Sequence, residues 1–157
     1  MAVRFYNTKG TYDCLSNFSR HGFQLDGMHW LTVEHYFQAQ KFHGTEHALA
    51  IQQAATPRQA KDLGRSRAVP MRADWEAVKD DVMRRAVLCK FEKHDEASVV
   101  LLGTGDEEII EDSPSDYYWG CGADGTGKNM LGKILMEVRA LLRERARLTE
   151  SPTGEAG

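Results

Sequence analysis

Glu34 and Lys41 are the two residues whose types and spacing most directly suggest chemistry. They lie seven positions apart in the segment EHYFQAQK, and at 100° per residue this spacing places two side chains only about 20° apart around a helix. Both border the apolar stripe of Val33 and Phe37, with Gln38 nearby. Partial burial would make the carboxyl a proton donor or acceptor and leave part of the amine neutral. Ordinary amphipathicity explains the same pair, because a lysine can bury its stem and a first-turn glutamate favours the helix dipole. Both interpretations stay open.

A second group of candidate residues surrounds a glycine-rich segment. Asp116 and Trp119 come just before Gly120, Gly125 and Gly127. A carboxylate and a large flat ring would therefore flank whatever this segment binds. Glycines let the backbone approach an anion closely, and the start of the helix that follows would direct free N–H groups at it. A flexible surface turn has the same composition, so the segment is compatible with either interpretation.

Two motif matches in the chain fail on their context. Residues 122–128 fit G-x-x-x-x-G-K, but Asn129 stands where a P-loop needs Ser or Thr for magnesium, which argues against a nucleotide triphosphatase. Residues 43–47 fit H-x-x-E-H, yet Gly44 interrupts the single helix that would bring both histidines to one metal ion. The sequence therefore predicts no metal site.

Trp75 and Arg65 also have two interpretations each. The spacing of Trp75 with Val78 and Val82 is that of a core anchor, although its ring is also a candidate to contact a ligand. Arg65 belongs to an R-S-R segment that is suited to binding phosphate or to lying in a solvated turn.

The elements that must position these residues follow from the periodicity, which predicts a helix-rich α+β domain with a small β-sheet. Thr32 is an expected N-cap, Thr56 followed by proline another, and Asp26-Gly27 suits a two-residue hairpin turn. The last helix is expected to bury an apolar face that includes Leu141. Expected strands cover residues 3–6, the hairpin 22–32, and 107–111 paired with the N-terminal strands; expected helices cover 33–43, 45–55, 57–64, 74–93, 97–102 and 129 onwards.

Length and composition are those of one globular domain. The chain has 157 residues, of which 41% are hydrophobic and 27% charged, so residues 1–148 are expected to form the domain and 149–157 a disordered tail. The net charge of −3 argues against bulk electrostatic coating of nucleic acid. Three cysteines without a C-x-x-C pair are typical of reduced thiols. No apolar run is long enough for a membrane span and no secretion signal is visible, so a cytoplasmic protein is expected.

Several motifs taken in order resemble one known family. They are Ser16-Asn17-Phe18, E-H-Y-F-Q-A-Q-K-F at 34–42, Gly64-Arg65, Trp75-Glu76 with Met83-Arg84, and D-x-x-W-G with G-x-G-K-N-x-L-G at 116–132. The chain resembles the NADAR family, which includes the YbiA-like N-glycosidases, from about residue 3 to 142. The resemblance implies the YbiA-like α+β fold and hydrolysis of a bond between the anomeric carbon of ribose and an exocyclic amine.

The resemblance also implies roles for individual residues. Glu34, Trp75, Asp116 and Trp119 match functional positions of the family, and Lys41 matches a lysine implicated in covalent catalysis. Cys121 departs from the acidic or small apolar residue expected there in some relatives, which bears on loop chemistry and substrate choice. The expected catalytic residues are Glu34, Lys41 and Asp116, and the expected substrate-binding residues are Asn17, Arg65, Trp75, Trp119, Gly120, Gly125, Gly127 and Asn129.

Two routes fit these residue types, and neither needs a metal or a redox cofactor. In one, neutral Lys41 attacks the ring-opened sugar and holds it as a Schiff base while Glu34 or Asp116 transfers protons. In the other, a carboxylate activates water against an oxocarbenium-like ribose.

The resemblance leaves two substrate classes, phosphorylated ribosylamino-pyrimidines of riboflavin synthesis and ADP-ribose attached to guanine in DNA. An acidic pI slightly favours a small molecule, whereas arginines of the last helix, Arg139, Arg143, Arg145 and Arg147, are candidates to contact a phosphate backbone. A non-catalytic module that binds ADP-ribose or NAD is the alternative; it would not need Glu34 and Lys41 together. The oligomeric state does not follow from the sequence.

Overall fold

Three threonines cap the starts of helices in the first half of the chain, as the sequence predicts for Thr32 and Thr56. The side chains of Thr32, Thr45 and Thr56 each accept a hydrogen bond from the backbone N–H three residues further on. Pro57 occupies the first turn of the third helix, where its missing N–H costs nothing. The helices that follow are α1 (Val33–Gln40), α2 (Glu46–Gln52) and α3 (Pro57–Gly64).

The computed structural model describes residues 1–155. In addition to these three helices it contains β1 (Ala2–Phe5), the 3-10 turn η1 (Asp13–Leu15), β2 (Phe23–Leu25), β3 (Met28–Trp30), α4 (Trp75–Lys93), α5 (Asp95–Gly103), β4 (Glu108–Glu111) and α6 (Met130–Glu155). The predicted helix-rich α+β fold is confirmed.

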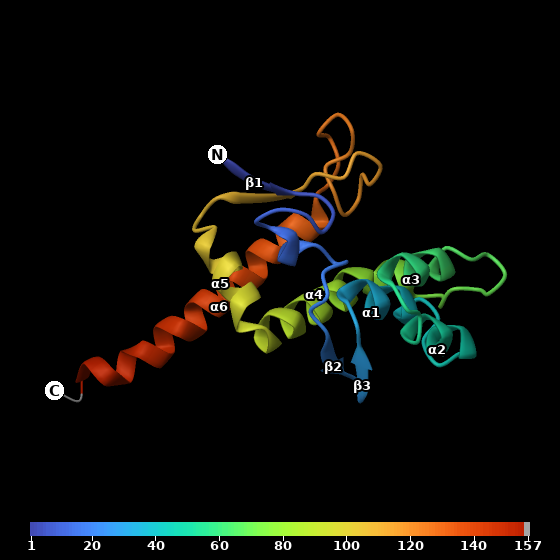
Figure 1. Ribbon diagram of the computed structural model, residues 1–157, viewed down its shortest axis with the longest axis horizontal. Coiled ribbons are helices and arrows are strands. Elements are labelled where there is room, and N and C mark those ends of the chain that lie inside the picture. The colour runs from blue at the N-terminus through green and yellow to red at the C-terminus, as the bar shows by residue number, and fades with distance from the viewer. Residues whose placement is uncertain (156–157) are drawn as a thin grey trace.

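Helix α1 lies at the centre of the molecule. All eight of its residues are buried, and it packs against α2, α3 and α4 (Figure 1). Helix α4 packs in turn against α5 and α6. Polar side chains on α1 are therefore held inside the protein, where they must find partners or face a cavity. The largest fully buried side chains of the core include Tyr36, Phe23, Phe42, Phe91, Met83, Leu131 and Ile134.

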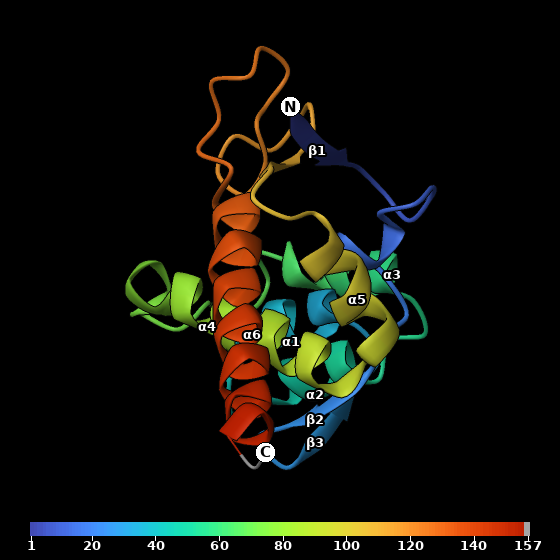
Figure 2. The same ribbon diagram turned by 90° about the vertical axis from the view of Figure 1, so that its left-hand side faces the viewer.

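The strands form two separate pairs instead of the expected single small sheet. Strands β2 and β3 are antiparallel and joined by Asp26 and Gly27, whose φ angles of 54° and 78° are those of the predicted tight turn. Strands β1 and β4 are parallel, with Phe5 opposite Glu111. The two pairs lie at opposite ends of the molecule in both views (Figures 1 and 2), which explains why they do not merge.

Helix α6 is longer than the sequence suggests. It continues to Glu155, past residue 149, where a disordered tail was expected to begin, and residues 133–151 contain no glycine or proline that would end it. Residues 156 and 157 of that expected tail lie outside the described residues. The far part of the helix extends beyond the body of the molecule (Figure 1), and Leu141, expected in the core, is 46% exposed because few elements reach it.

Within residues 1–155, no helix combines the length and apolar character needed to cross a membrane. Over the same residues, no group of three or more His, Cys, Asp or Glu side chains is placed to hold a metal ion.

Candidate active site

A partly enclosed cavity of about 220 Å³ brings together side chains from distant parts of the chain. Its wall is formed by α1, α3, α4, the loop after η1, and the segment that follows β4. In both ribbon views the segment between β4 and α6 folds back beside β1, at the N-terminal end of α6 (Figures 1 and 2). The lining residues are Ser16, Asn17, Phe18, Glu34, Phe37, Gln38, Lys41, Lys61, Arg65, Met83, Glu111, Asp116 and Trp119.

Glu34 and Lys41 both line this cavity, as their spacing on one helix predicts. Glu34 is only 7% exposed and accepts a hydrogen bond of 2.8 Å from Gln38 Nε2. Burial raises the pKa of Glu34, and the Gln38 bond, Lys61 and Lys41 offset this in part. The carboxyl therefore retains its proton to a higher pH than an exposed glutamate does.

Lys41 immediately follows α1, with its Nζ 5.7 Å from the centroid of the Phe37 ring. Burial lowers the pKa of Lys41, and the nearby positive charges of Arg65, Arg67 and Lys61 lower it further, whereas Glu34 raises it. A larger fraction of this amine is neutral, and hence nucleophilic, than for a solvated lysine.

Asp116 and Trp119 also reach the cavity. Asp116 Oδ1 accepts hydrogen bonds from the backbone N–H groups of Tyr118 and Trp119, at 3.0 and 2.8 Å, and so fixes the turn that carries the tryptophan. The Trp119 ring meets Phe37 edge to face, with centroids 5.2 Å apart. One oxygen of Asp116 thus has a structural role, and the aromatic pair forms an apolar wall beside the carboxyls.

Asn17 and Arg65 complete the expected residues that line the cavity. Asn17 Nδ2 donates to Met83 Sδ at 3.5 Å, while its Oδ1 is buried and has no partner in the described part of the chain. Gln38 Oε1 and Glu111 Oε2 are buried and unpartnered in the same way. Three such oxygens around one cavity leave hydrogen-bonding positions for a polar ligand, because buried polar atoms normally have partners.

Trp75 does not line the cavity. Its side chain is buried on α4 beneath Phe37, with ring centroids 5.1 Å apart, so it occupies the position of a core anchor. It supports the aromatic wall from behind, since Phe37 contacts both Trp75 and Trp119.

The glycine-rich segment does not form the expected anion cradle. The N–H of Gly127 donates to the Cys121 carbonyl at 2.7 Å, and that of Asn129 donates to the Gly120 carbonyl at 3.0 Å. The first two N–H groups of α6 donate to the carbonyls of residues 118 and 119. These N–H groups therefore already donate within the chain, and Gly125 is exposed on the surface. None of the four binding residues expected in this segment, Gly120, Gly125, Gly127 and Asn129, lines the cavity.

Two charged residues of the cavity were missed by the sequence analysis. The position of Lys61 beside Arg65 was predictable from the helical repeat, because Lys61 lies one turn before Arg65, the residue that caps the end of α3. Glu111 has no such signal, because the predicted pairing of this strand with the N-terminal strands does not state which face of the strand points inward. The four arginines of the last helix that were candidates for a phosphate backbone each pair within the chain, with partners that include Thr104, Asp106, Glu92 and Glu144.

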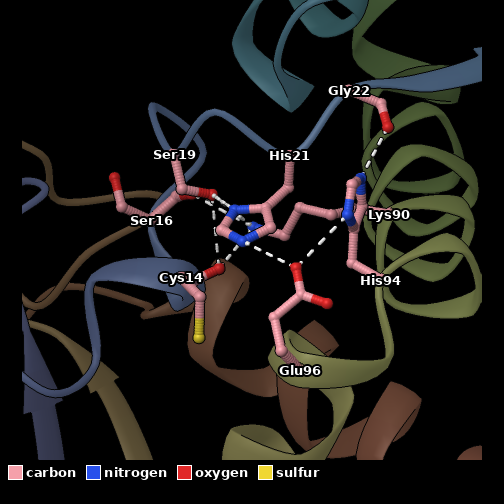
Figure 3. A network of polar contacts seen from close by, with 8 residues as sticks. All are labelled: Cys14, Ser16, Ser19, His21, Gly22, Lys90, His94 and Glu96. Atoms are coloured by element: carbon pink, nitrogen blue, oxygen red, sulfur yellow. Dashed lines mark hydrogen bonds and ion pairs between the residues drawn. The ribbon is translucent and has the colours of Figure 1, made fainter.

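The loop that carries Asn17 is held from inside by Lys90 of α4. Figure 3 shows the Lys90 ammonium donating to the carbonyls of Cys14 and Ser16, at 2.6 and 3.1 Å, and to Ser19 Oγ at 3.2 Å. Lys90 is 1% exposed, and burial lowers its pKa to about 7. His21 also contacts Ser19 Oγ, at 3.0 Å. The shape of this part of the cavity therefore depends on a buried amine.

Comparisons with known proteins find relatives over nearly the whole chain. N-glycosidase Npun_R5314 of Nostoc punctiforme is 49% identical over 152 residues, which cover 95% of this chain and 97% of that protein. N-glycosidase YbiA of Escherichia coli strain K12 is 44% identical over 140 residues, covering 89% and 88%. The riboflavin biosynthesis protein PYRR of Zea mays is 40% identical over 153 residues, but these are only 25% of its length.

A solved structure shares the fold. The NMR structure of the Escherichia coli protein YbiA superposes with a TM-score of 0.85 at 42% identity, covering 92% of this chain and 86% of that one. The sequence model of the NADAR domain matches residues 4–143, nearly the whole of the described chain. The chain therefore belongs to the NADAR domain family.

Proposed function

We propose that this protein is an N-glycosidase that releases a base from a phosphorylated ribosylamine, with Lys41 as the nucleophile. The reaction class is supported by family membership and by similarity over nearly the full length to proteins named N-glycosidase. The observation that carries the mechanism is that Glu34 and Lys41 line one small cavity and that burial shifts both pKa values toward the neutral forms.

Lys41 supplies the covalent step. The ribosylamine opens to an imine, and the lone pair of Lys41 Nζ attacks C1 to form a geminal diamine. The bond from C1 to the base nitrogen then breaks, its electron pair stays on that nitrogen, and the nitrogen takes up a proton. Lys41 Nζ and C1 now form an iminium ion. Water adds to C1, the C1–Nζ bond breaks as Nζ takes up a proton, and the released ribose phosphate closes its ring.

Glu34 is the first candidate to carry the protons of Lys41. Attack by the amine leaves an N–H proton that must be removed, and breakdown of the iminium requires it to return. Glu34 faces the same cavity, and its raised pKa brings it closer to neutrality, where both directions of transfer are efficient. Asp116 is the second candidate, through the oxygen that does not bind the backbone of the turn.

Positive charge at the rim supports a phosphorylated substrate. Lys61 and Arg65 line both this cavity and an adjoining recess of about 550 Å³, which also contains Arg58. The backbone N–H of Arg65 donates to the carbonyls of Lys61 and Asp62. Its guanidinium makes no hydrogen bond or ion pair within residues 1–155, so this group is available for a phosphate.

A riboflavin-pathway ribosylamino-pyrimidine phosphate is the preferred substrate class. Two relatives are named riboflavin biosynthesis proteins, at 40% and 38% identity. The arginines of α6 that were candidates for a DNA backbone are paired within the chain. ADP-ribosylated guanine in DNA is the competing substrate, and the assay includes it.

The decisive experiment combines product release with borohydride trapping. Purified protein is incubated with a ribosylamino-pyrimidine phosphate or with ADP-ribosylated DNA, and released base or free ADP-ribose is followed. Lys41→Ala and Glu34→Gln should abolish turnover while leaving the thermal unfolding transition in place. Borohydride should attach a reduced sugar to Lys41. Lys133→Ala, an exposed lysine of α6 outside the cavity, is the matched control and should keep full activity.

Each outcome of this experiment has a definite meaning. A Lys41→Ala protein that hydrolyses the substrate at the normal rate removes the Schiff base and leaves direct attack by water. Faster release from ADP-ribosylated DNA than from the pyrimidine phosphate reverses the substrate assignment. Binding without release of either product makes the protein a non-catalytic ribosyl-binding module.

A further inference from the structure

Glu111 is a carboxyl of the cavity that neither the motifs nor the proposed route uses. It is the last residue of β4 and lines both the cavity and the adjoining recess. Its Oε2 is buried and has no hydrogen-bond partner in the described chain. A buried carboxyl oxygen without a partner is expensive to maintain, so it is expected where a ligand supplies the missing contact.

The glycine-rich segment holds the backbone of Glu111 in place. The N–H of Glu111 donates to Asn129 Oδ1 and its carbonyl accepts from the N–H of Cys121, both at 2.9 Å. Asn129 also donates from Nδ2 to the Ile109 carbonyl at 2.9 Å. A Cβ atom at Gly120 would lie 2.9 Å from the Glu111 carbonyl oxygen, so the close approach requires glycine. The motif that resembles an anion cradle is thus a clamp on the end of β4.

The other charged groups that line the cavity with Glu111 come from α1, α3 and the segment after β4, whereas α4 and the loop after η1 contribute only uncharged side chains. Glu34 and Lys41 face it from α1, Lys61 and Arg65 from α3 and its end, and Asp116 from the segment after β4. Burial, Asp116 and Glu34 together raise the pKa of Glu111 to about 8, and Lys61 opposes them. At neutral pH most of the Glu111 carboxyls in the population are therefore protonated.

We propose that Glu111 is a catalytic acid that protonates the departing base, a role that rests on the proposed N-glycosidase function. As the bond from C1 to the base nitrogen breaks, the nitrogen keeps the electron pair and takes the proton from the Glu111 hydroxyl, whose O–H bond breaks. The resulting carboxylate then accepts a proton from the water that attacks C1, which restores the acid. Asp116 is less suited to this step because one of its oxygens already binds two backbone N–H groups.

Glu111→Gln is the test variant, because it keeps the shape of the side chain and removes the acidic proton. We expect kcat to fall by about 10²-fold or more, with KM within twofold of the wild type. The loss should shrink for substrates whose leaving base is less basic, since these need less protonation. The alkaline decline of wild-type activity near pH 8 should be absent in the variant. Glu108→Gln changes an exposed glutamate of the same strand and is the matched control.

A direct titration separates this inference from the function on which it rests. Proteins with ¹³C-labelled glutamate carboxyls are titrated by NMR, and one resonance that titrates near pH 8 should be missing in Glu111→Gln. A wild-type enzyme that is active, together with a variant of unchanged rate and unchanged alkaline limb, overturns the role of Glu111. A wild type that releases no base from either substrate class overturns the proposed function, and the catalytic role of Glu111 with it, even when the resonance titrates as expected.

Discussion

Replacing Lys90 by methionine should change how the stability of the protein depends on pH. Lys90 is 1% exposed, and burial lowers its pKa to about 7, whereas a lysine in an unfolded chain titrates near pH 10.4. Between these two pH values the unfolded chain binds a proton that the folded protein has released. The free energy of unfolding of the wild type therefore rises with pH across this window and falls as the pH drops toward 7.

The size of the effect follows from the two pKa values. Their difference corresponds to roughly 5 kcal/mol over the whole window, at 1.36 kcal/mol for each pH unit. About 2 kcal/mol of it falls between pH 7 and pH 9, because the folded-state amine is already half deprotonated at the lower end. Lys90→Met keeps an unbranched side chain of similar length and has no group to titrate, so it lacks this contribution.

Urea denaturation at pH 7, 8 and 9 measures the effect. The stability of the wild type relative to Lys90→Met should increase by about 2 kcal/mol from pH 7 to pH 9. The charge of Lys90 lowers the pKa values of Cys14 and His21. The comparison is therefore repeated with Cys14→Ala in both proteins. Lys93→Met, an exposed lysine of the same helix, should give a flat difference.

One result would refute this reasoning. If the difference between wild type and Lys90→Met stays constant from pH 7 to pH 9, Lys90 remains an ammonium throughout. Its three oxygen acceptors would then outweigh the cost of burial, and the loop of Asn17 would be held by a permanent charge.

Two other substitutions test the clamp and the acid of α1. Gly127→Ala would place a Cβ atom 2.4 Å from the Gly120 carbonyl oxygen. We therefore expect the free energy of unfolding, measured by urea denaturation, to fall by about 1–3 kcal/mol. A variant of unchanged stability that only binds phosphate less tightly would favour the anion-cradle interpretation instead. Gln38→Met removes the hydrogen bond that lowers the pKa of Glu34. The acidic limb of the pH–rate profile should therefore move to higher pH. If the acidic limb does not move, it does not report the titration of Glu34.

Local rules predicted much of the fold and the part of the site that lies on α1. Glu34 and Lys41 are separated by seven residues of one helix, so the helical repeat alone places them on one side. The caps at Thr32 and Thr56 were predictable for the same reason, because a cap involves only the next three residues.

The rest of the site depends on contacts between distant segments. Glu111 faces the cavity because β4 pairs with β1, and the sequence of β4 alone does not state which side of the strand faces inward. The glycine pattern was compatible with an anion cradle or a surface turn, and glycines do not reveal which carbonyls accept the N–H groups of the loop. Arg139 appeared to belong to a solvated face, yet it is buried and donates to Thr104 and Glu107.

The parallel pairing of β1 with β4 has a consequence for how the protein matures. These strands are separated by about a hundred residues, and joining chain ends that far apart costs roughly 4 kcal/mol of loop entropy. On a ribosome, residues 2–5 must wait for β4 to emerge before they can pair, so the strand that carries Glu111 is anchored late. A nascent or truncated chain can therefore contain the first helices and Lys41 before the wall of the cavity that carries Glu111 has formed.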